Sequence, residues 1–120
     1  MTDCVLLRLG WPSSKLNPNR SDGRSHWFNA KERKAAKLEG QGEALLRGAK
    51  NVRGDKFVLK VTGYPPDNRR RDDDNFLKCL KHHRDGIALA MGVDDSKFRW
   101  EFQGFERAGS SGVLIEVVGE

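Results

Sequence analysis

Alternation of apolar and polar side chains in residues 56–62 is the feature that most constrains the fold of this chain. Phe57, Leu59 and Val61 occupy every second position there, so they share one face of an extended strand. The same alternation recurs in residues 98–102, where aromatic residues alternate with polar ones. Because each such strand has one apolar face, the faces must be covered by a second layer of structure. The chain is therefore expected to build a sheet with helices packed on it.

Two further strands are predicted near the ends of the chain. Residues 4–9 form a short run rich in valine and leucine, which Gly10 and Pro12 bring to an end. Residues 113–118 form a second apolar run, preceded by the turn sequence Gly-Ser-Ser-Gly at residues 109–112. Together with the two alternating segments, these runs predict four strands.

A first helix is predicted over residues 31–49. Asn29 is a candidate N-cap, and Glu32 stands where a capping box would place its partner. Gly40 and Gly42 lie inside the helix, and because glycine costs about 1 kcal/mol relative to alanine there, we expect a bend or break. The apolar side of this helix is expected to consist of Leu38, Leu45, Leu46 and Ala49.

A second helix is predicted from about Asp74 to Gly92. Six of its residues recur at helical spacing and should face the sheet: Phe76, Leu77, Leu80, Ile87, Ala88 and Met91. The resulting order, β-α-β-α-β-β, predicts the α/β class, with two helices on a four-stranded mixed sheet in two layers. With 120 residues, the chain has room for one core, so residues 1–120 are expected to form a single domain.

Composition argues against a membrane or secreted protein. No apolar run approaches the roughly 18 residues that span a bilayer, so we expect no membrane partner. The first residues lack the basic and then apolar regions of a secretory signal. Cys4 and Cys79 lie far apart without metal-type spacing, which is typical of reduced thiols in a cytoplasmic protein.

Charge is unevenly distributed along the chain, whose formal net charge is +5. Residues 1–60 carry 13 Lys and Arg against 6 Asp and Glu, whereas residues 61–120 carry 9 against 11. Two acidic clusters, at residues 72–74 and 94–95, interrupt an otherwise basic chain. A basic surface favours a polyanionic partner, but it does not explain acidic clusters within it. A metal ion held near a phosphate backbone accounts for both.

The segment 69–78 carries the residues best suited to chemistry. In extended backbone before a helix, Asp72 and Asp74 would point to one side, and Lys78 follows Asp74 by one helical turn. Either Asp94 or Asp95 could supply a third carboxylate. Mg²⁺ prefers oxygen ligands of this kind and is commonly held by one or two carboxylates together with phosphate.

These residue types suit hydrolysis of a phosphodiester. A metal ion can lower the pKa of the attacking water and stabilise charge on the leaving oxygen. Lys78 could stabilise charge on the phosphorus centre or protonate the leaving oxygen. The three arginines at residues 69–71 would neutralise neighbouring phosphates.

The residues alone leave other interpretations open. Three aspartates before a helix are also favoured by capping and by the helix dipole, and an acidic pair after glycine is typical of a solvated turn. Trp11 and Trp27 border the long loop of residues 11–26 and are candidates for stacking on unpaired bases. Trp100 alternates with its strand neighbours and is expected in the core.

One known family shares this pattern. Residues 69–78 read Arg-Arg-Arg-Asp-Asp-Asp-Asn-Phe-Leu-Lys, and Gly92 and the pair Asp94-Asp95 follow. This resembles the signature of the RusA family of Holliday-junction resolvases, in which basic residues precede Asp-x-Asp-Asn, a later lysine and Asp-Asp. Residues 11–14, Trp-Pro-Ser-Ser, resemble that family's N-terminal loop. The chain departs from the pattern at Asp73, where the family has an apolar residue.

The resemblance implies a homodimeric endonuclease that uses Mg²⁺ or Mn²⁺ to nick opposed strands of four-way junction DNA in recombination and repair. It implies that Asp72, Asp74 and Asp95 bind the metal and are catalytic, and that Lys78 is the catalytic lysine. The residues expected to contact DNA are Lys15, Arg20, Arg24, Arg69, Arg70, Arg71 and Lys81. Two alternatives remain: another structure-specific Mg²⁺ nuclease that acts on forks or flaps, and a non-catalytic DNA-binding protein of a prophage.

Overall fold

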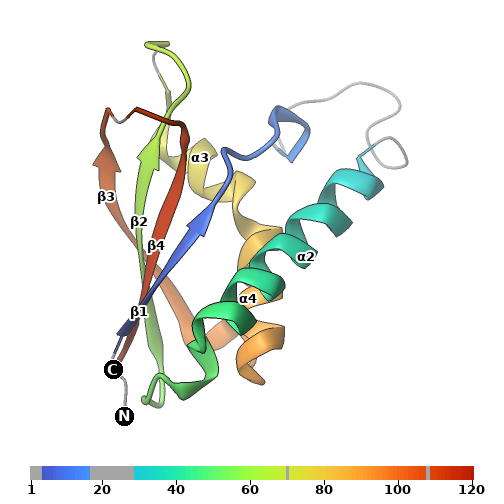
Figure 1. The fold of residues 1–120 in the computed structure, drawn as a ribbon, viewed down its shortest axis with the longest axis vertical. Coiled ribbons are helices and arrows are strands. Elements are labelled where there is room, and N and C mark those ends of the chain that lie inside the picture. The colour runs from blue at the N-terminus through green and yellow to red at the C-terminus, as the bar shows by residue number, and fades with distance from the viewer. Residues whose placement is uncertain (1–3, 17–28, 70, 108) are drawn as a thin grey trace.

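The computed structural model describes residues 4–16, 29–69, 71–107 and 109–120, without the side chain of Lys15. A four-stranded sheet forms one layer, and the helices cover one face of it (Figure 1). The predicted α/β class and the mixed four-stranded sheet are confirmed.

The sheet has the strand order β1-β4-β2-β3. Strand β4 is antiparallel to both of its neighbours, whereas β2 and β3 are parallel. The strands are β1 (Cys4–Leu9), β2 (Phe57–Tyr64), β3 (Phe98–Phe105) and β4 (Gly112–Gly119). All four lie where the apolar patterns predicted them.

Strand β2 shows why alternation of apolar and polar residues predicted a strand correctly. Leu59 and Val61 are fully buried, and Leu59 lies opposite Val117 of β4 and Trp100 of β3. Because β2 is flanked on both sides, its backbone groups are paired within the sheet and its apolar face is covered by helices. The core therefore lies between this central strand and the helical layer.

Within the described residues, the helical layer contains three α-helices rather than the predicted two: α2 (Ala30–Arg47), α3 (Asp73–Cys79) and α4 (Lys81–Met91). The predicted second helix is interrupted at Leu80, whose backbone leaves helical geometry at φ −94° and ψ 2°. Leu80 is fully buried, so the turn follows from tertiary packing, without the glycine or proline that would have announced it. Single-turn 3₁₀ helices also occur: η1 (Ser14–Leu16), η2 (Ala49–Asn51) and η3 (Asp95–Lys97).

Helices α3 and α4 form the crossover that joins the parallel strands β2 and β3. A parallel connection must carry the chain back along the sheet before the next strand begins. The chain turns back after β2 to enter α3 (Figure 1), and η3 directly precedes β3 in the sequence. This topology separates the two acidic clusters, which stand at opposite ends of the crossover.

Helix α2 differs from its prediction in its continuity, in the capping at its N-terminus and in the residue at which it ends. It runs through Gly40 and Gly42 as one continuous helix, without the expected break. Asn29 is its N-cap residue, as predicted, but its side chain makes no capping hydrogen bond, so the asparagine half of the predicted capping box is absent. The helix ends at Gly48, whose φ of 72° is the left-handed conformation that glycine adopts without strain.

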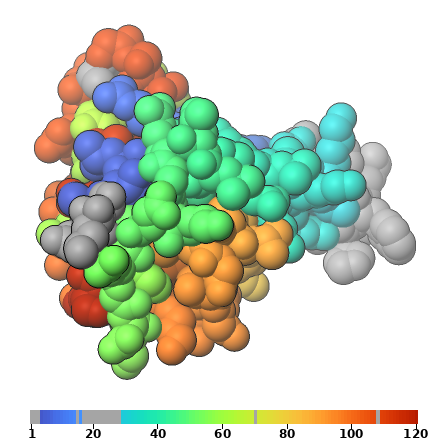
Figure 2. Space-filling view, turned by 60° about the horizontal axis from the view of Figure 1, so that its bottom comes forward, coloured from blue at the N-terminus to red at the C-terminus, as the bar shows by residue number. Residues whose placement is uncertain are grey.

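Three of the four residues predicted to form the apolar side of this helix are exposed, and only Ala49, which lies beyond α2 in η2, is buried as predicted. Leu38, Leu45 and Leu46 are exposed, with 57%, 57% and 74% of their surface accessible. The buried residues are Ala36, Gly40 and Ala44. Small residues are required there because α2 packs directly on α4, as Figures 1 and 2 both show.

The contact between α2 and α4 brings backbone against backbone. A Cβ atom added at Gly40 would overlap the carbonyl oxygen of His83, and one added at Gly86 would overlap that of Lys37. Close approach, rather than hydrophobicity, thus selects the face that α2 buries. In the described part of the chain, no helix is long and apolar enough to cross a membrane.

Candidate metal and DNA-binding site

The start of α3 presents the first two predicted acids. Asp72 is the N-cap residue, in extended backbone, and its Oδ1 accepts a hydrogen bond of 3.0 Å from the backbone N–H of Asp74. Asp73 Oδ1 accepts from the same N–H, also at 3.0 Å. The capping role that the sequence left open is therefore real for Asp72. A carboxylate has roughly four acceptor positions, so a single hydrogen bond leaves Asp72 able to bind a cation as well.

Asp74 and Lys78 share one face of α3, as their spacing predicted. Asp74 Oδ2 and Lys78 Nζ are 3.4 Å apart, and the two side chains are 74% and 49% exposed. An exposed pair of this kind contributes little to stability, typically below about 1 kcal/mol. Both groups are thus open to a ligand from solvent.

Asp94 and Asp95 have different surroundings. Asp94 Oδ1 accepts a hydrogen bond of 2.9 Å from the backbone N–H of Ser96, which lowers the pKa of Asp94 and makes it the cap of η3. The pKa of Asp95 is raised, chiefly by its hydrogen bond with Asp94. Asp95 Oδ2 lies 3.7 Å from a terminal nitrogen of Arg84 on α4. Asp95, rather than Asp94, therefore faces the helical layer.

The structure does not gather all three predicted carboxylates. Within residues 4–16, 29–69, 71–107 and 109–120, no three His, Cys, Asp or Glu side chains form a group that could hold a metal ion. Asp72 and Asp74 stand at the start of the crossover, and Asp95 stands at its end. The two exposed carboxylates on α3 still fit a hard cation, because Mg²⁺ commonly takes one or two carboxylates and completes its shell with water and phosphate.

The arginine segment, defined here as residues 67–69 and 71, is held together by hydrogen bonds among its own residues. Asp67 accepts from the backbone N–H of Arg69 at 3.0 Å and from a terminal nitrogen of Arg71 at 2.7 Å. These two bonds, in that order, are the main reasons why the pKa of Asp67 is lowered. Arg71 also donates to the carbonyl oxygens of Asp67 and Arg69, at 3.1 and 2.9 Å. Arg71 thus shapes this loop, whereas Arg69 remains 82% exposed although its Nε donates to Asp67 Oδ2 at 3.2 Å.

Trp11 is engaged within the fold. Its ring stacks on Phe76, with centroids 5.0 Å apart and planes inclined by 19°. The guanidinium carbon of Arg71 lies 5.1 Å from the centroid of the same ring. Trp11 therefore joins the arginine segment to α3, and these contacts occupy the ring that was a candidate for stacking on bases.

A half-buried pair of side chains, His83 and Glu39, fixes the chain just before Trp11. His83 of α4, 2% exposed, is 2.9 Å from Glu39 of α2 through its Nε2. The other oxygen of Glu39 accepts a 2.8 Å hydrogen bond from the backbone N–H of Gly10. The pKa of Glu39 is lowered, first by the bond with His83. Both helices thereby hold the end of β1 in place.

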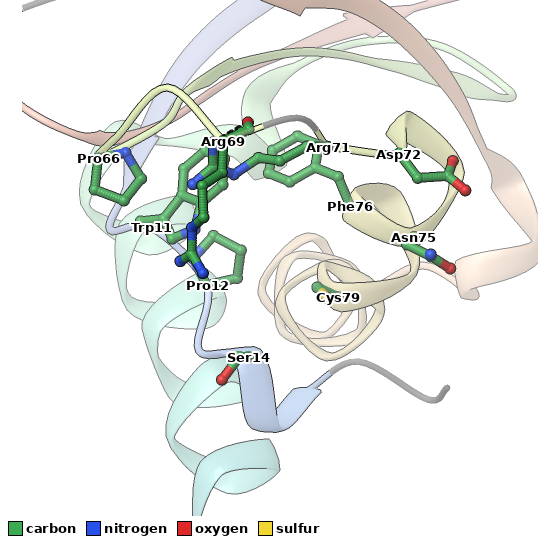
Figure 3. Close-up of a pocket in the computed structure, with 10 residues that line it drawn as sticks. All are labelled: Trp11, Pro12, Ser14, Pro66, Arg69, Arg71, Asp72, Asn75, Phe76 and Cys79. Carbon is green, nitrogen blue, oxygen red and sulfur yellow. Dashed lines mark hydrogen bonds between the residues drawn. The ribbon is translucent and has the colours of Figure 1, made fainter. Parts of the chain in front are cut away.

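Two hollows flank α3. The Trp11 pocket, about 430 Å³, is lined by Trp11, Arg69 and Arg71 on one side and by Asp72 and Asn75 beyond Phe76 (Figure 3). The second hollow, about 380 Å³, is named here the Trp100 pocket. Its polar and aromatic lining residues are Asp74, Lys78, Lys81, His82, Arg84 and Trp100. The two acids of α3 thus open onto different hollows.

The structure describes some of the other residues that were predicted to contact DNA and leaves others outside the described ranges. Lys81 is exposed at the first position of α4 and lines the Trp100 pocket. Arg20, Arg24 and Arg70 lie outside the described residues, as does Trp27. Lys15 belongs to η1, but its side chain is not among the described parts.

Three residues of the Trp100 pocket were not predicted as functional: His82, Arg84 and Trp100. Trp100 is packed against the core, as the strand pattern indicated, but it is only partly buried and also lines the pocket. Lys81 and Arg84 are three residues apart on one helix and so project on one side. That spacing could have indicated a basic stripe, but only the fold shows that Trp100 adjoins it.

Comparison with known proteins adds a relative without a described activity. No protein-family model matches the chain. An uncharacterised protein of Xylella fastidiosa (strain Temecula1 / ATCC 700964) is 40% identical over 99 residues, which cover 77% of this chain and 61% of the relative. The chain thus spans about three fifths of the length of that relative. Functional inference consequently depends on the residues of this chain.

Proposed function

We propose that this chain is a Mg²⁺-dependent, structure-specific endonuclease that resolves four-way DNA junctions by paired nicks. The observation that supports this most is the start of α3, where the carboxylate of Asp74 lies 3.4 Å from the ammonium group of Lys78 and both are exposed. A carboxylate and an ammonium group at this spacing, beside hollows lined with cations, are better explained by hydrolysis of a phosphodiester than by phosphate binding alone. A binding protein gains nothing from carboxylates that repel DNA.

Asp72 and Asp74 would hold the metal ion, whereas Asp95, the predicted third ligand, stands at the other end of the crossover and is left out of the proposed pair. When bound, Mg²⁺ would supply an activated water and stabilise the leaving oxygen. Two carboxylates are a usual number of protein ligands to Mg²⁺ when a phosphate and waters supply the rest. Mn²⁺ prefers similar oxygen ligands and is expected to substitute.

Lys78 would act on the phosphate itself. Its ammonium group is held on the same face as Asp74, so a phosphate oxygen brought to the acid also meets a positive charge. The same group could donate the proton that the leaving 3′-oxygen requires. Either role depends on Lys78 being accessible, and its side chain is 49% exposed.

DNA would approach along both flanks of α3. Arg69 is exposed beside the Trp11 pocket, and Lys81 is exposed beside the Trp100 pocket. Cations on each side of the acids would offset their repulsion of the phosphate backbone. We further propose a homodimer, because two symmetry-related sites can nick two symmetry-related strands of one junction.

The test is cleavage of a labelled four-way junction beside linear duplex and fork DNA, in Mg²⁺, in Mn²⁺ and in EDTA. Wild-type protein is expected to nick the junction symmetrically and to be inactive in EDTA. Asp74→Asn is expected to lower cleavage on the order of 100-fold or more while junction binding persists. Asp73→Asn makes the same charge change one residue away and should remain active.

Each departure from that pattern has a distinct meaning. Cleavage of all three DNAs would support a less selective nuclease that uses the same acids. Tight binding without cleavage in either metal would instead support a DNA-binding protein. Full activity of Asp74→Asn would remove Asp74 from the mechanism.

A further inference from the structure

The Trp100 pocket combines an aromatic wall with several cations. Its volume of about 380 Å³ falls within the range of roughly 300–1,000 Å³ that is usual for small-molecule sites. Among its lining residues, Lys78, Lys81 and Arg84 are cationic and Asp74 is the one carboxylate. The excess of positive charge favours an anionic ligand.

Arg84 is less fully bonded than the arginine on the other flank of α3. Its guanidinium carbon lies 5.4 Å from the ring centroid of Trp100. Its ion pair with Asp95, at 3.7 Å, is longer than a hydrogen bond. Its Nε is buried and has no hydrogen-bond partner among the described residues. An acceptor supplied by a ligand would therefore suit this guanidinium.

His82 adds a polar group that need not carry charge. It lines the same pocket, and partial burial is the main cause that lowers its pKa. A neutral imidazole has one nitrogen that donates and one that accepts a hydrogen bond. The pocket thus offers aromatic surface, cations and a neutral polar group, which are the groups that bind base, phosphate and base edge in single-stranded DNA.

We propose that the Trp100 pocket binds one unpaired nucleotide of DNA, next to the phosphate at Asp74. The base packs against Trp100 and the guanidinium of Arg84, and Lys81 contacts its phosphate. A base within a duplex is stacked on its neighbours and would have to leave the stack to enter. The position next to the cut phosphate rests on the proposed function, whereas binding of the nucleotide does not.

The Trp11 pocket is less suited to the same ligand. Trp11 already stacks on Phe76, and Arg71 already donates to Asp67 and to two carbonyl oxygens. A nucleotide there would compete with contacts that hold the loop together. The difference between the two hollows assigns the unpaired nucleotide to the Trp100 side.

The test measures binding in EDTA, so that no metal and no cleavage are needed. The full chain is titrated into a fluorescently labelled short oligothymidylate, and separately into a labelled duplex, and anisotropy is followed. Loss of a stacked base contact costs about 1–3 kcal/mol on truncation of the aromatic residue, which corresponds to about 5- to 150-fold in affinity. Trp100→Leu is expected to weaken oligothymidylate binding by at least about 5-fold, and Trp100→Phe to weaken it less.

Matched variants separate this pocket from general attraction to charge. Arg84→Gln should weaken oligothymidylate binding more than duplex binding. Arg99→Gln removes the same charge one residue from Trp100, from a side chain that is paired with Glu120, and should have a smaller effect. Thermal unfolding of each variant confirms that it is folded.

The proposal is overturned if Trp100→Leu binds like wild type, or if Arg84→Gln and Arg99→Gln weaken both DNAs equally. Because these measurements exclude metal, they are independent of the cleavage test. A protein that binds the oligonucleotide through Trp100 and never cuts would refute the nuclease and retain the pocket. A protein that cuts junctions, but whose Trp100→Leu variant binds oligothymidylate as tightly as wild type, would support the nuclease and refute the pocket.

Discussion

The two flanks of α3 both carry cations, but the structure uses them differently. In the arginine segment, the guanidinium of Arg71 is held by Asp67 and by two backbone carbonyls, and its side chain is only 16% exposed. In the Trp100 pocket, Lys81 is exposed, and Arg84 pairs with Asp95 at 3.7 Å and lies over the Trp100 ring. Arg71, the last residue of the densest basic run in the chain, thus mainly holds its own loop together. Charge counted along a sequence does not locate charge that a ligand can reach.

The difference suggests a division of roles. Arg71 joins Asp67 to Trp11, and Trp11 stacks on Phe76 of α3, so the arginine segment fixes the position of the acids. Under the proposed function, the cations of the other flank would contact DNA. Variants that remove one cation from each flank can break this comparison.

The largest effect is expected for Lys78→Ala. Removing the ammonium group beside Asp74 should lower the single-turnover cleavage rate by about 100-fold, the usual effect of losing one transition-state donor. Junction affinity and stability should change little, because the ion pair that is lost is exposed. Lys97→Ala, which removes an exposed lysine from η3, is the control. Wild-type rates in Lys78→Ala would exclude Lys78 from the chemistry.

Arg71→Ala should instead reduce stability. It removes the contact with Trp11 and the bonds to two carbonyl oxygens, an expected loss of about 1–3 kcal/mol in the free energy of unfolding. Urea unfolding measures it, and Arg69→Ala, at an 82% exposed side chain, should stay within about 0.5 kcal/mol of wild type. Arg71→Lys should rescue poorly, because a single ammonium group cannot replace the planar fork. Equal stability of Arg71→Ala and Arg69→Ala would contradict the loop-forming role.

The salt dependence of binding should separate the flanks next. Lys81→Ala is expected to lower the slope of log affinity against log salt concentration by about 1, the contribution of one phosphate contact. Arg71→Ala should leave the slope unchanged, because its charge is already neutralised by Asp67. Junction binding measured in EDTA over a series of NaCl concentrations tests both. A lower slope in Arg71→Ala alone would reverse the assignment of the two flanks.

The smallest expected effect concerns two carboxylates, one from each end of the crossover. The pKa of Asp67 should lie below its ordinary 3.8 and that of Asp95 above 3.8. Ionised Asp67 is favoured by folding, so its contribution to stability is complete above the unfolded-state pKa and is lost as pH falls through the lower folded-state pKa. For Asp95 the sign is opposite, because folding favours its protonated form. Titration of carboxyl carbons by NMR in EDTA gives both values; the reverse order would contradict these environments.

The sequence predicted the sheet better than the helices. Alternation specified β2 and β3 because a strand with one buried face must repeat every two residues, as Leu59 and Val61 do. The face of α2 was mispredicted because Leu38, Leu45 and Leu46 outweigh Gly40 and Ala44 in hydrophobicity. The buried face is set instead by the close contact between the backbones of α2 and α4, which only small residues allow. The turn at Leu80 has no local signal, since leucine favours helix and only burial in the core holds it there.

The contacts of the candidate site that lie within one helix were predictable from the sequence. Spacing alone placed Lys78 beside Asp74, because one helical turn separates them. Spacing could not place Asp95 against Arg84, or Arg84 over Trp100, because those contacts join different elements. Nor could it distinguish Arg71 from Arg69, since only the loop conformation brings Arg71 onto Asp67 and Trp11.

The glycine contact between α2 and α4 has a consequence for how variants of this protein are interpreted. A Cβ atom added at Gly40 would meet backbone atoms of His83, and one added at Gly86 would meet backbone atoms of Lys37 and Gln41, so no side-chain rotamer could absorb it. Alanine at either position would push the helices apart and displace Arg84, two residues from Gly86. Activity can therefore be lost through a substitution that meets neither metal nor nucleic acid. In a screen for inactive mutants, these two glycines would be indistinguishable from catalytic residues until the fold of each mutant is measured.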